Sequence, residues 1–399
     1  MIYLDNSATT PIHPDVLNAM MPYLKGGYGN AGAVYRIGRE SAKAIQKARE
    51  QVAQLFNASP EQIVFTSGGS EGNNMAFSYG MKCMLEKAGK KHVVISQIEH
   101  DSVYEAATHM FAPTGKSNIK DDFYTHFIHT KQDGTIDVKH LEELLNTDES
   151  IGLVSVMYVN NETGAVNPIN HIGEMCKERG ILFHTDCVQA AGCHAIDTNL
   201  IGCDYATISG HKIYAPKGIG AIYVRDKSMA RSLIYGGSNQ EFGLRGGTEN
   251  VASIVGLGKA CDIICSDFGA QRVTVSLLKR LFYENVISGL KEYGIDERVH
   301  VNGASVGDVG KTLNLRIEDI DSETLLLMLD AKGVCISAGS ACHSHKSDPS
   351  RVLTSMGLSD DEARDSVRIS FSSMNTPVEV EEAAEIFSAC VKTLARLQR

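Results

Sequence analysis

Two polar residues, each placed after an apolar, strand-like run, carry the clearest chemical signal in the chain. Lys212 ends the string Ser-Gly-His-Lys that begins at the close of the run Tyr205–Ser209, and Asp186 follows the run Ile181–Thr185. A lysine amine can form a Schiff base with the aldehyde of pyridoxal 5'-phosphate, and a carboxylate can keep the ring nitrogen protonated so that the ring accepts electrons. The pair therefore predicts a pyridoxal-phosphate site in which Lys212 carries the cofactor and Asp186 contacts its ring.

A glycine-rich turn offers a place for the phosphate of such a cofactor. The string Ser67-Gly68-Gly69-Ser70 lies between a strand-like run and a helical pattern. Glycines let backbone N–H groups approach a phosphate, and the start of a helix adds unpaired donors. Alone, such a turn is more simply a helix cap. Its spacing matches neither the P-loop nor the Gly-x-Gly-x-x-Gly fingerprint, so nucleotide binding is disfavoured. Beside the lysine and aspartate pair, we expect Gly69 and Ser70 to bind the phosphate together with Ser209 and His211.

Three more polar residues follow strand-like runs and are candidates for contacts with the ring: His100, Asn161 and Gln189. An imidazole at His100 can stack on the ring and transfer protons near neutral pH, although a polar residue at a helix start would look the same. Gln189 can reach the ring hydroxyl if a helical turn follows Asp186. Asn161 is either a turn residue or a donor to cofactor and substrate.

The segment Ser337–Pro349 is small, polar and rich in serine, so it predicts an exposed, mobile loop rather than a piece of core. A cysteine in such a loop, here Cys342, is expected to be reactive, and His343, His345 and Lys346 are near enough in sequence to favour its thiolate. Cys342 and the two histidines are too tightly spaced for a closed tetrahedral metal site, so we expect no metal.

Arg368 lies in a short alternating run, Ser366–Ser370, that predicts a strand. An arginine on a strand can clamp an α-carboxylate with two hydrogen bonds. The simpler alternative is an arginine paired with an aspartate or glutamate, and the residue alone favours that alternative.

Composition narrows the class of protein. The 399 residues are 43% hydrophobic and 22% charged, with a net charge of −10 and a pI near 5.8, which argues against a dominant nucleic-acid or anionic-membrane surface. The N-terminus shows no secretory signal and no apolar run approaches the roughly 20 residues of a membrane span, so we expect a cytoplasmic protein. None of the ten cysteines forms a Cys-x-x-Cys pair, and the nine other than Cys342 are expected to be free thiols buried as small apolar residues.

Strand-length apolar runs alternate with helical patterns between residues 63 and 224, which predicts a mostly parallel sheet covered on both faces. Ligands of such sheets bind beyond the carboxyl ends of the strands. The expected strands are Ile63–Thr66, His92–Ser96, Phe123–Phe127, Ile151–Tyr158, Ile181–Thr185, Tyr205–Ser209 and Gly220–Val224, the last two pairing antiparallel. The expected helices are Ser70–Cys83, Ser102–Met110, Val138–Leu145 and Ile169–Arg179.

After about residue 265 the pattern changes to that of a smaller α+β unit. We expect a large domain over residues 16–262 and a small domain formed by residues 1–15 and 263–399, with the Cys342 loop in the small domain. Gly247–Ser266 is the expected linker helix. The expected elements that follow are helices at Gln271–Leu290, Ser322–Ala331 and Val378–Leu394 and strands near Thr312–Arg316, Val334–Ile336 and Val367–Ser370.

Taken together, these strings resemble the cysteine desulfurases of the class V aminotransferase group, in the subgroup with a flexible catalytic loop. These are pyridoxal-phosphate enzymes with the aspartate-aminotransferase-like fold. The strings that carry the resemblance are Tyr3–Thr10, Phe65–Gly68, Glu99–His100, Val159–Glu162, His184–Asp186, Ser209–Lys212, Arg245–Asn250, Gly339–Cys342 and Arg368. The chain departs from the family's pattern at Gly29–Tyr35, and at Ser70 where threonine is more usual.

The resemblance implies a role for each matched residue. Lys212 would hold pyridoxal phosphate, His100 would stack on its ring, and Arg368 with Asn161 would hold the carboxylate of L-cysteine. Cys342 would take the sulfur as a persulfide, leaving L-alanine, and pass it to an acceptor protein for iron–sulfur cluster assembly or nucleic-acid thiolation. The remaining cofactor contacts would come from Gly69, Ser70, Asn161, Asp186, Gln189, Ser209, His211 and, across the interface of a homodimer, Thr248.

Two alternatives stay open at this point. A selenocysteine lyase or another aminotransferase would keep its turnover when Cys342 is replaced. A non-catalytic, cofactor-bound platform would keep its biological activity when Lys212 is replaced, although the presence of Lys212, Asp186 and Cys342 together disfavours it.

Overall fold

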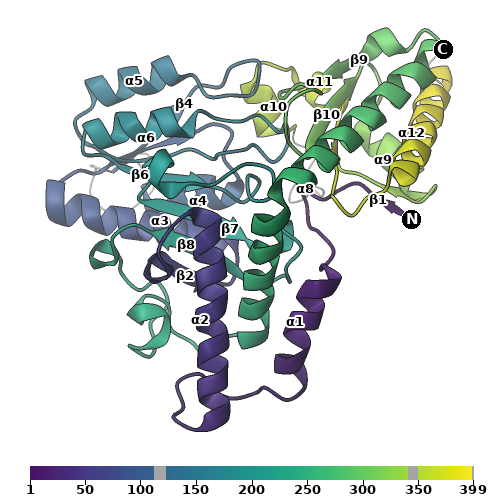
Figure 1. Cartoon of the computed structure of the whole chain (residues 1–399). Helices are drawn as coiled ribbons and strands as arrows, with labels where there is room; N and C mark the ends of the chain where they lie inside the picture. Colours follow the sequence, from purple (N-terminus) through teal and green to yellow (C-terminus); the bar gives the residue numbers. More distant parts are fainter. Residues whose placement is uncertain (112–122, 340–348, 398–399) are drawn as a thin grey trace.

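A seven-stranded sheet forms the centre of the larger part of the molecule (Figure 1). The structure is a computed structural model that describes residues 1–111, 123–339 and 349–397. The strand order is β2-β8-β7-β6-β5-β3-β4, and β8 alone runs against the other six. The strands are β2 (Ile63–Thr66), β3 (His92–Ser96), β4 (Tyr124–Ile128), β5 (Ile151–Ser155), β6 (Leu182–Asp186), β7 (Tyr205–Ser209) and β8 (Gly220–Val224).

The predicted sheet is thereby confirmed, including the antiparallel pairing of β7 with β8. The main difference is in β5, which ends at Ser155 instead of Tyr158. Beyond that point the backbone N–H groups of Val156 and Tyr158 still donate to β6, to the carbonyl oxygens of His184 and Asp186, but the chain has left the regular ladder.

Helices cover both faces of the sheet because neighbouring residues of a strand point to opposite sides. In β3, Val94 packs in the core under α5 and α6, whereas Val93 and Ile95 pack in the cluster under α3 and α4. These four helices are α3 (Gly69–Cys83), α4 (Asp101–Met110), α5 (Val138–Thr147) and α6 (Ile169–Glu178), each within two residues of its predicted bounds. Within residues 1–224, the helices without a sequence prediction are α1 (Pro14–Lys25), α2 (Arg36–Phe56) and α7 (Thr198–Ile201).

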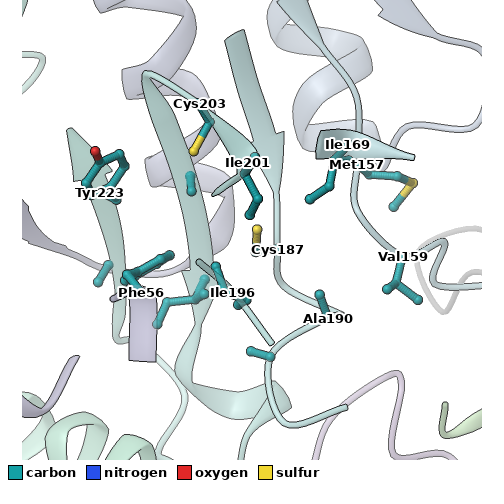
Figure 2. Close-up of a cluster of buried hydrophobic side chains, with 14 of the residues drawn as sticks. Phe56, Met157, Val159, Ile169, Cys187, Ala190, Ile196, Ile201, Cys203 and Tyr223 are labelled. Atoms are coloured by element: carbon teal, nitrogen blue, oxygen red, sulfur yellow. The ribbon is translucent and has the colours of Figure 1, made fainter. Parts of the chain in front are cut away.

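Free thiols fill part of the apolar interior, as expected. Figure 2 shows Cys187 and Cys203 among Ile196 and Ile201 in the main core. The buried cysteines of the described residues are Cys83, Cys176, Cys187, Cys193, Cys203, Cys261 and Cys390.

The prediction of full burial is wrong for Cys265 and Cys335, which are only partly buried. In the two-residue strand that holds Cys335, Val334 points into the core, so the alternation of the strand turns the thiol to the other side.

A second core lies under a smaller group of strands and helices at the other end of the molecule (Figure 1). Strands β12, β10 and β9 form an antiparallel sheet, and β1 pairs with β11 in parallel. The elements are β1 (Ile2–Tyr3), β9 (Val299–Val301), β10 (Thr312–Ile317), α9 (Ser322–Asp330), β11 (Val334–Cys335), α10 (Arg351–Ser355), α11 (Asp360–Arg364), β12 (Ser366–Ser370) and α12 (Pro377–Leu397). Ile2 and Leu4 are part of this core, so the N-terminal strand packs with the C-terminal third of the chain.

One long helix, α8 (Val251–Lys291), joins the two cores. Its first half contributes Leu257 and Ile264 to the main core, and its second half contributes Phe282 and Val286 to the second core. Asp267 has a non-helical backbone (φ −129°, ψ 23°), which divides the helix close to the point between the two predicted helical stretches. The exact domain boundaries stay a prediction.

In the part of the chain that the structure describes, no helix combines the length and the apolar character that crossing a membrane requires.

Candidate active site

A cavity of about 250 Å³ opens beyond the carboxyl ends of β6 and β7. Parallel α/β sheets present their ligand sites at this edge. Residues from the main sheet, from α3 and from the second core line it together: Ser7, Ala8, Gly69, Ser70, Asn73, His100, Ser102, Met157, Asn161, Asp186, Val188, Gln189, Ser209, His211, Lys212 and Arg368. The structure thus brings together every described site residue that the sequence predicts, except Thr248.

The two residues that opened the sequence argument meet in this cavity. Asp186 is the last residue of β6 and is 4% exposed. Its Oδ2 accepts a hydrogen bond from Asn73 Nδ2 (2.8 Å) and its Oδ1 accepts one from Val188 N (2.8 Å). Lys212 ends the single turn after β7, and its Nζ donates to the carbonyl oxygens of Ser7 and Ala8, both at 2.6 Å. A carboxylate and an amine are therefore fixed on neighbouring strands of one sheet.

Asn73 is a site residue that the sequence reasoning missed. It lies three residues after Ser70, and residues three apart share one face of a helix. The signal was therefore present in the helical pattern. What the pattern does not contain is the partner, because Asp186 lies 113 residues further along the chain.

The start of α3, where the sequence predicts a phosphate site, lines the cavity with Gly69 and Ser70. Glycines at its first turn let it lie close to β7 and to the chain after β6. A Cβ at Gly72 would come within 2.6 Å of Thr207 Cγ2 in β7, and one at Gly69 within 3.1 Å of Val188 Cγ2. His211 also lines the cavity, and its Nδ1 lies 3.2 Å from Thr9 Oγ1. Burial, and next the charge of Lys212, lower the pKa of His211 to about 4.

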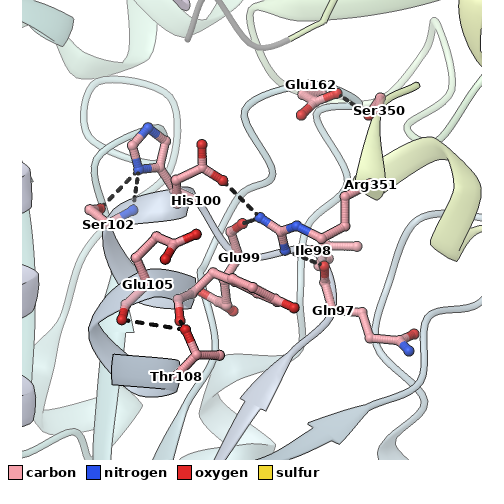
Figure 3. A network of polar contacts seen from close by, with 12 residues as sticks. Gln97, Ile98, Glu99, His100, Ser102, Glu105, Thr108, Glu162, Ser350 and Arg351 are labelled. Atoms are coloured by element: carbon pink, nitrogen blue, oxygen red, sulfur yellow. Dashed lines mark hydrogen bonds and ion pairs between the residues drawn. The ribbon is translucent and has the colours of Figure 1, made fainter. Parts of the chain in front are cut away.

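His100 starts α4 as its N-cap residue and also lines the cavity (Figure 3). Its Nδ1 accepts from Ser102 N (3.1 Å) and lies 2.8 Å from Ser102 Oγ. Burial lowers the pKa of His100, and nearby Lys212 lowers it further while Asp186 opposes the shift. The imidazole is therefore neutral at neutral pH, and its proton lies on Nε2 because Nδ1 is an acceptor. His100 is thus a helix cap that also lines the cavity, and its stacking on a cofactor ring stays a prediction.

The turn that carries His100 is held by Arg351, a second residue that the sequence reasoning missed. Figure 3 shows the guanidinium of Arg351 beside the main chain of this turn. It donates to the carbonyl oxygens of Gln97 (2.7 Å) and Glu99 (2.9 Å) and to Asp101 Oδ1 (3.0 Å). It also lies over the ring of Tyr104, 4.0 Å from the centroid. Arg351 begins α10, so an element from the C-terminal part of the chain fixes a turn of the main sheet.

Arg368 is buried in β12, 1% exposed. Its Nη2 donates to Asp5 Oδ1 (2.8 Å) and its Nη1 to the carbonyl oxygen of Asn161 (3.2 Å). The predicted alternative, a pairing with an acidic residue, is thus present, and Arg368 lines the cavity as well. Asn161 provides this carbonyl oxygen from a turn that follows β5. The turn is held by the side chain of Asn160, which accepts hydrogen bonds from the N–H groups of Glu162 and Thr163.

Pyridoxal phosphate fits the groups in this cavity. Three buried polar atoms of lining residues have no hydrogen-bond partner among the described residues: Oδ1 of Asn73, Oε1 of Gln189 and Nε of Arg368. The Nε2 of Gln189 is already used, because it donates to the carbonyl oxygen of Ser7 (3.0 Å). The free Oε1 is therefore left to accept a hydrogen bond from a hydroxyl such as that of the ring. Buried polar atoms without partners are costly, so a polar ligand is expected there.

Two predicted residues are not part of the cavity as described. Thr248 is exposed in the segment before α8, and its expected contact with a neighbouring subunit stays a prediction. Cys342 lies outside the described residues. The chain on both sides of residues 340–348 is described, and Ser350 Oγ donates to Glu162 Oε2 (2.5 Å), next to the turn that holds Asn161.

Comparisons with known proteins show the family to which the chain belongs. Residues 2–382 match the family described as Aminotransferase class-V. A cysteine desulfurase of Nostoc sp. is 38% identical over 398 residues, which cover 100% of this chain and 94% of that protein. A solved NifS-like protein aligns with a TM-score of 0.85 at 29% identity over 98% of this chain and 100% of that one. A solved structure of SspA in complex with cysteine aligns at 0.76 with 34% identity over 94% of this chain and 100% of that one. These matches confirm the predicted α/β fold class and the resemblance, and the chain belongs to the cysteine desulfurase family of class V aminotransferases.

Proposed function

We propose that this protein is a pyridoxal-phosphate-dependent cysteine desulfurase. It converts L-cysteine to L-alanine and keeps the sulfur as a persulfide on Cys342, for transfer to an acceptor protein. The observation that carries the proposal is the meeting of Lys212, Asp186, His100 and Arg368 around one cavity. Pyridoxal phosphate, held by Lys212, would draw electrons from the α-carbon of the substrate.

Different residues of the cavity would bind the substrate, orient the cofactor and transfer protons. Arg368 offers a buried positive charge for the substrate carboxylate, and Asn161 lies beside it. Asp186, oriented by Asn73, would hold the protonated ring nitrogen of the cofactor. Because the neutral His100 carries its proton on Nε2, it is a proton donor, and the amine of Lys212 is the group able to accept the α-proton.

The sulfur step balances without an added oxidant. The thiolate of Cys342 attacks the substrate sulfur, a sulfur–sulfur bond forms and the carbon–sulfur bond breaks. The substrate carbon is reduced as it takes up a proton to become the methyl group of alanine, and the transferred sulfur is oxidised to the persulfide level.

We propose a cytoplasmic homodimer in which Thr248 reaches the phosphate of the neighbouring subunit. The acceptor would be a protein of iron–sulfur cluster assembly or of nucleic-acid thiolation. The net charge of −10 favours a protein partner over direct nucleic-acid binding.

The test is to measure alanine and sulfide released from L-cysteine by the purified holoenzyme in the presence of a thiol reductant. Equal amounts of both products are expected, with loss of both in Cys342→Ala while the visible absorbance of the bound cofactor remains. Lys212→Ala is expected to lose that absorbance. Turnover that survives Cys342→Ala would refute the persulfide route and favour a selenocysteine lyase or an aminotransferase.

A further inference from the structure

Two histidines and an aspartate lie close together outside the active site, near the amino ends of strands β3 and β4 of the large sheet. His92 is the first residue of β3, His126 lies in the edge strand β4, and Asp148 directly follows α5. His92 Nδ1 is 2.5 Å and His126 Nε2 is 2.8 Å from the same oxygen, Oδ2 of Asp148. We propose that these three side chains bind a divalent transition-metal ion of the zinc type.

The sheet itself sets the positions of the ligands. In the parallel ladder His92 is paired with Tyr124, and His126 lies two residues further along β4, so both imidazoles are on one face. That face is the one covered by α5, whose end presents Asp148. The N–H groups of Lys91 and His92 both donate to the carbonyl oxygen of Ser150 (3.0 Å each), which ties the strand to the chain after α5.

Asp148 is held as a charged ligand. Its Oδ1 accepts from Ser150 N (2.8 Å), which leaves Oδ2 facing the imidazoles. The contacts of its two oxygens with Ser150 N and with the two imidazoles stabilise the charged carboxylate form. The side chains of His92, His126 and Asp148 are 25%, 20% and 21% exposed, so solvent reaches each of them.

The distances are close to those of a bound ion. The three ligand atoms lie within 4.8 Å of one another. Two ligands about 2 Å from a tetrahedral zinc ion are about 3.3 Å apart, so each nitrogen would move away from the carboxylate by less than about 1 Å. Two imidazoles and one carboxylate favour zinc, cobalt, nickel or copper over magnesium and calcium. The site is at the amino ends of the strands, whereas the active site is beyond their carboxyl ends, so it does not belong to the catalytic cavity.

The test uses the holoenzyme with Cys342→Ser, which removes the reactive thiol as a competing ligand. After treatment with a chelator, Zn²⁺ is titrated and followed by calorimetry, and its effect on the midpoint of thermal unfolding is measured. We expect one saturable equivalent and a higher unfolding midpoint. Asp148→Asn and His126→Asn should each weaken this binding by about ten-fold or more, since even outer-sphere partners of a metal contribute on this scale.

The control is His140→Asn. His140 stacks on His129 with ring centroids 3.8 Å apart, and its Nδ1 accepts from the backbone N–H of His129 instead of facing a carboxylate. Zinc binding should be unchanged in this variant. Circular dichroism establishes that each variant is folded, and two independent substitutions guard against the failure of one. The absence of saturable binding, or equal binding in the parent and in both site variants, would leave only a hydrogen-bonded triad and overturn the proposal.

Discussion

Replacing Arg351 with glutamine is expected to slow turnover far more than it weakens substrate binding. The change removes three hydrogen bonds, two to carbonyl oxygens and one to Asp101, from the turn that presents His100. A hydrogen bond from a charged group contributes about 1.5 to 3 kcal/mol when buried. Because the side chain of Arg351 is 32% exposed, we discount the three together to about 2 kcal/mol.

If all of this energy serves to hold His100 in its working position, its loss corresponds to a rate effect of about 30-fold. We therefore expect kcat for alanine formation to fall by about 5- to 30-fold. KM for L-cysteine should change little, because Arg368 and Asn161 are not touched. Arg351→Lys keeps the charge but loses the planar fork of donors, so it should recover only part of the rate.

Arg298→Gln is the matched control. Arg298 also donates to a backbone carbonyl, that of Glu318, and to a carboxylate, that of Asp319, and its side chain is 26% exposed. It lies beside β9 and does not line the cavity. Its replacement should lower the unfolding midpoint without a change in kcat. If Arg351→Gln keeps full turnover although its stability falls, or if both variants lose activity equally, the positioning argument is refuted.

Three further predictions concern other parts of the molecule. Burial raises the pKa of Glu99 from 4.5 to about 8, so between these pH values the folded state holds a proton that the unfolded state has released. The free energy of unfolding should therefore fall as the pH rises from about 4.5 to 8. Glu99→Gln should remove this part of the pH dependence when unfolding by denaturant is measured. Gly173→Ala should destabilise the protein by several kcal/mol or prevent folding, because the new Cβ in α6 would lie 1.8 Å from the carbonyl oxygen of Ile201 in α7. Gly269→Ala is the control, because open space surrounds this position, and it should stabilise α8 by about 0.5–1 kcal/mol. Arg368→Lys should raise KM for L-cysteine by about ten-fold or more while the cofactor absorbance is kept, because one ammonium group cannot replace two guanidinium donors.

The sequence predicts the large sheet well because each strand is a local pattern. Four of its strands match their predicted bounds, and the alternation with helices indicates the edge at which Asp186 and Lys212 meet. α1 and α2 had no prediction, since their role is to pack against α8, a partner that a local pattern does not contain.

The sequence predicted the site residues that directly follow a strand-like run. It did not predict those whose role depends on a partner far away in the chain. Asp186 and Lys212 follow apolar runs, so their position alone suggests exposure at a sheet edge. Arg351 has no such signal, because its partners at residues 97–101 lie about 250 positions earlier in the chain. Glu99 was noted only as part of a motif. Its carboxyl group accepts a hydrogen bond from Met157 N, 58 residues further along the chain, and only the fold supplies that contact.

The two cores contribute different functions to one cavity, and this division has a physical consequence. Asp186 and Lys212 are anchored on strands of the main core, whereas Arg368 is flanked in β12 by Val367 and Ile369, both part of the second core. α8 packs against both cores, and its helical geometry is interrupted only at Asp267. A change that loosens the second core should therefore impair the substrate carboxylate site before it impairs the cofactor site. Leu4 lies in that core a few residues before Ser7 and Ala8, whose carbonyl oxygens hold the Lys212 amine. The N-terminal segment is therefore one route by which such a change would also reach the cofactor.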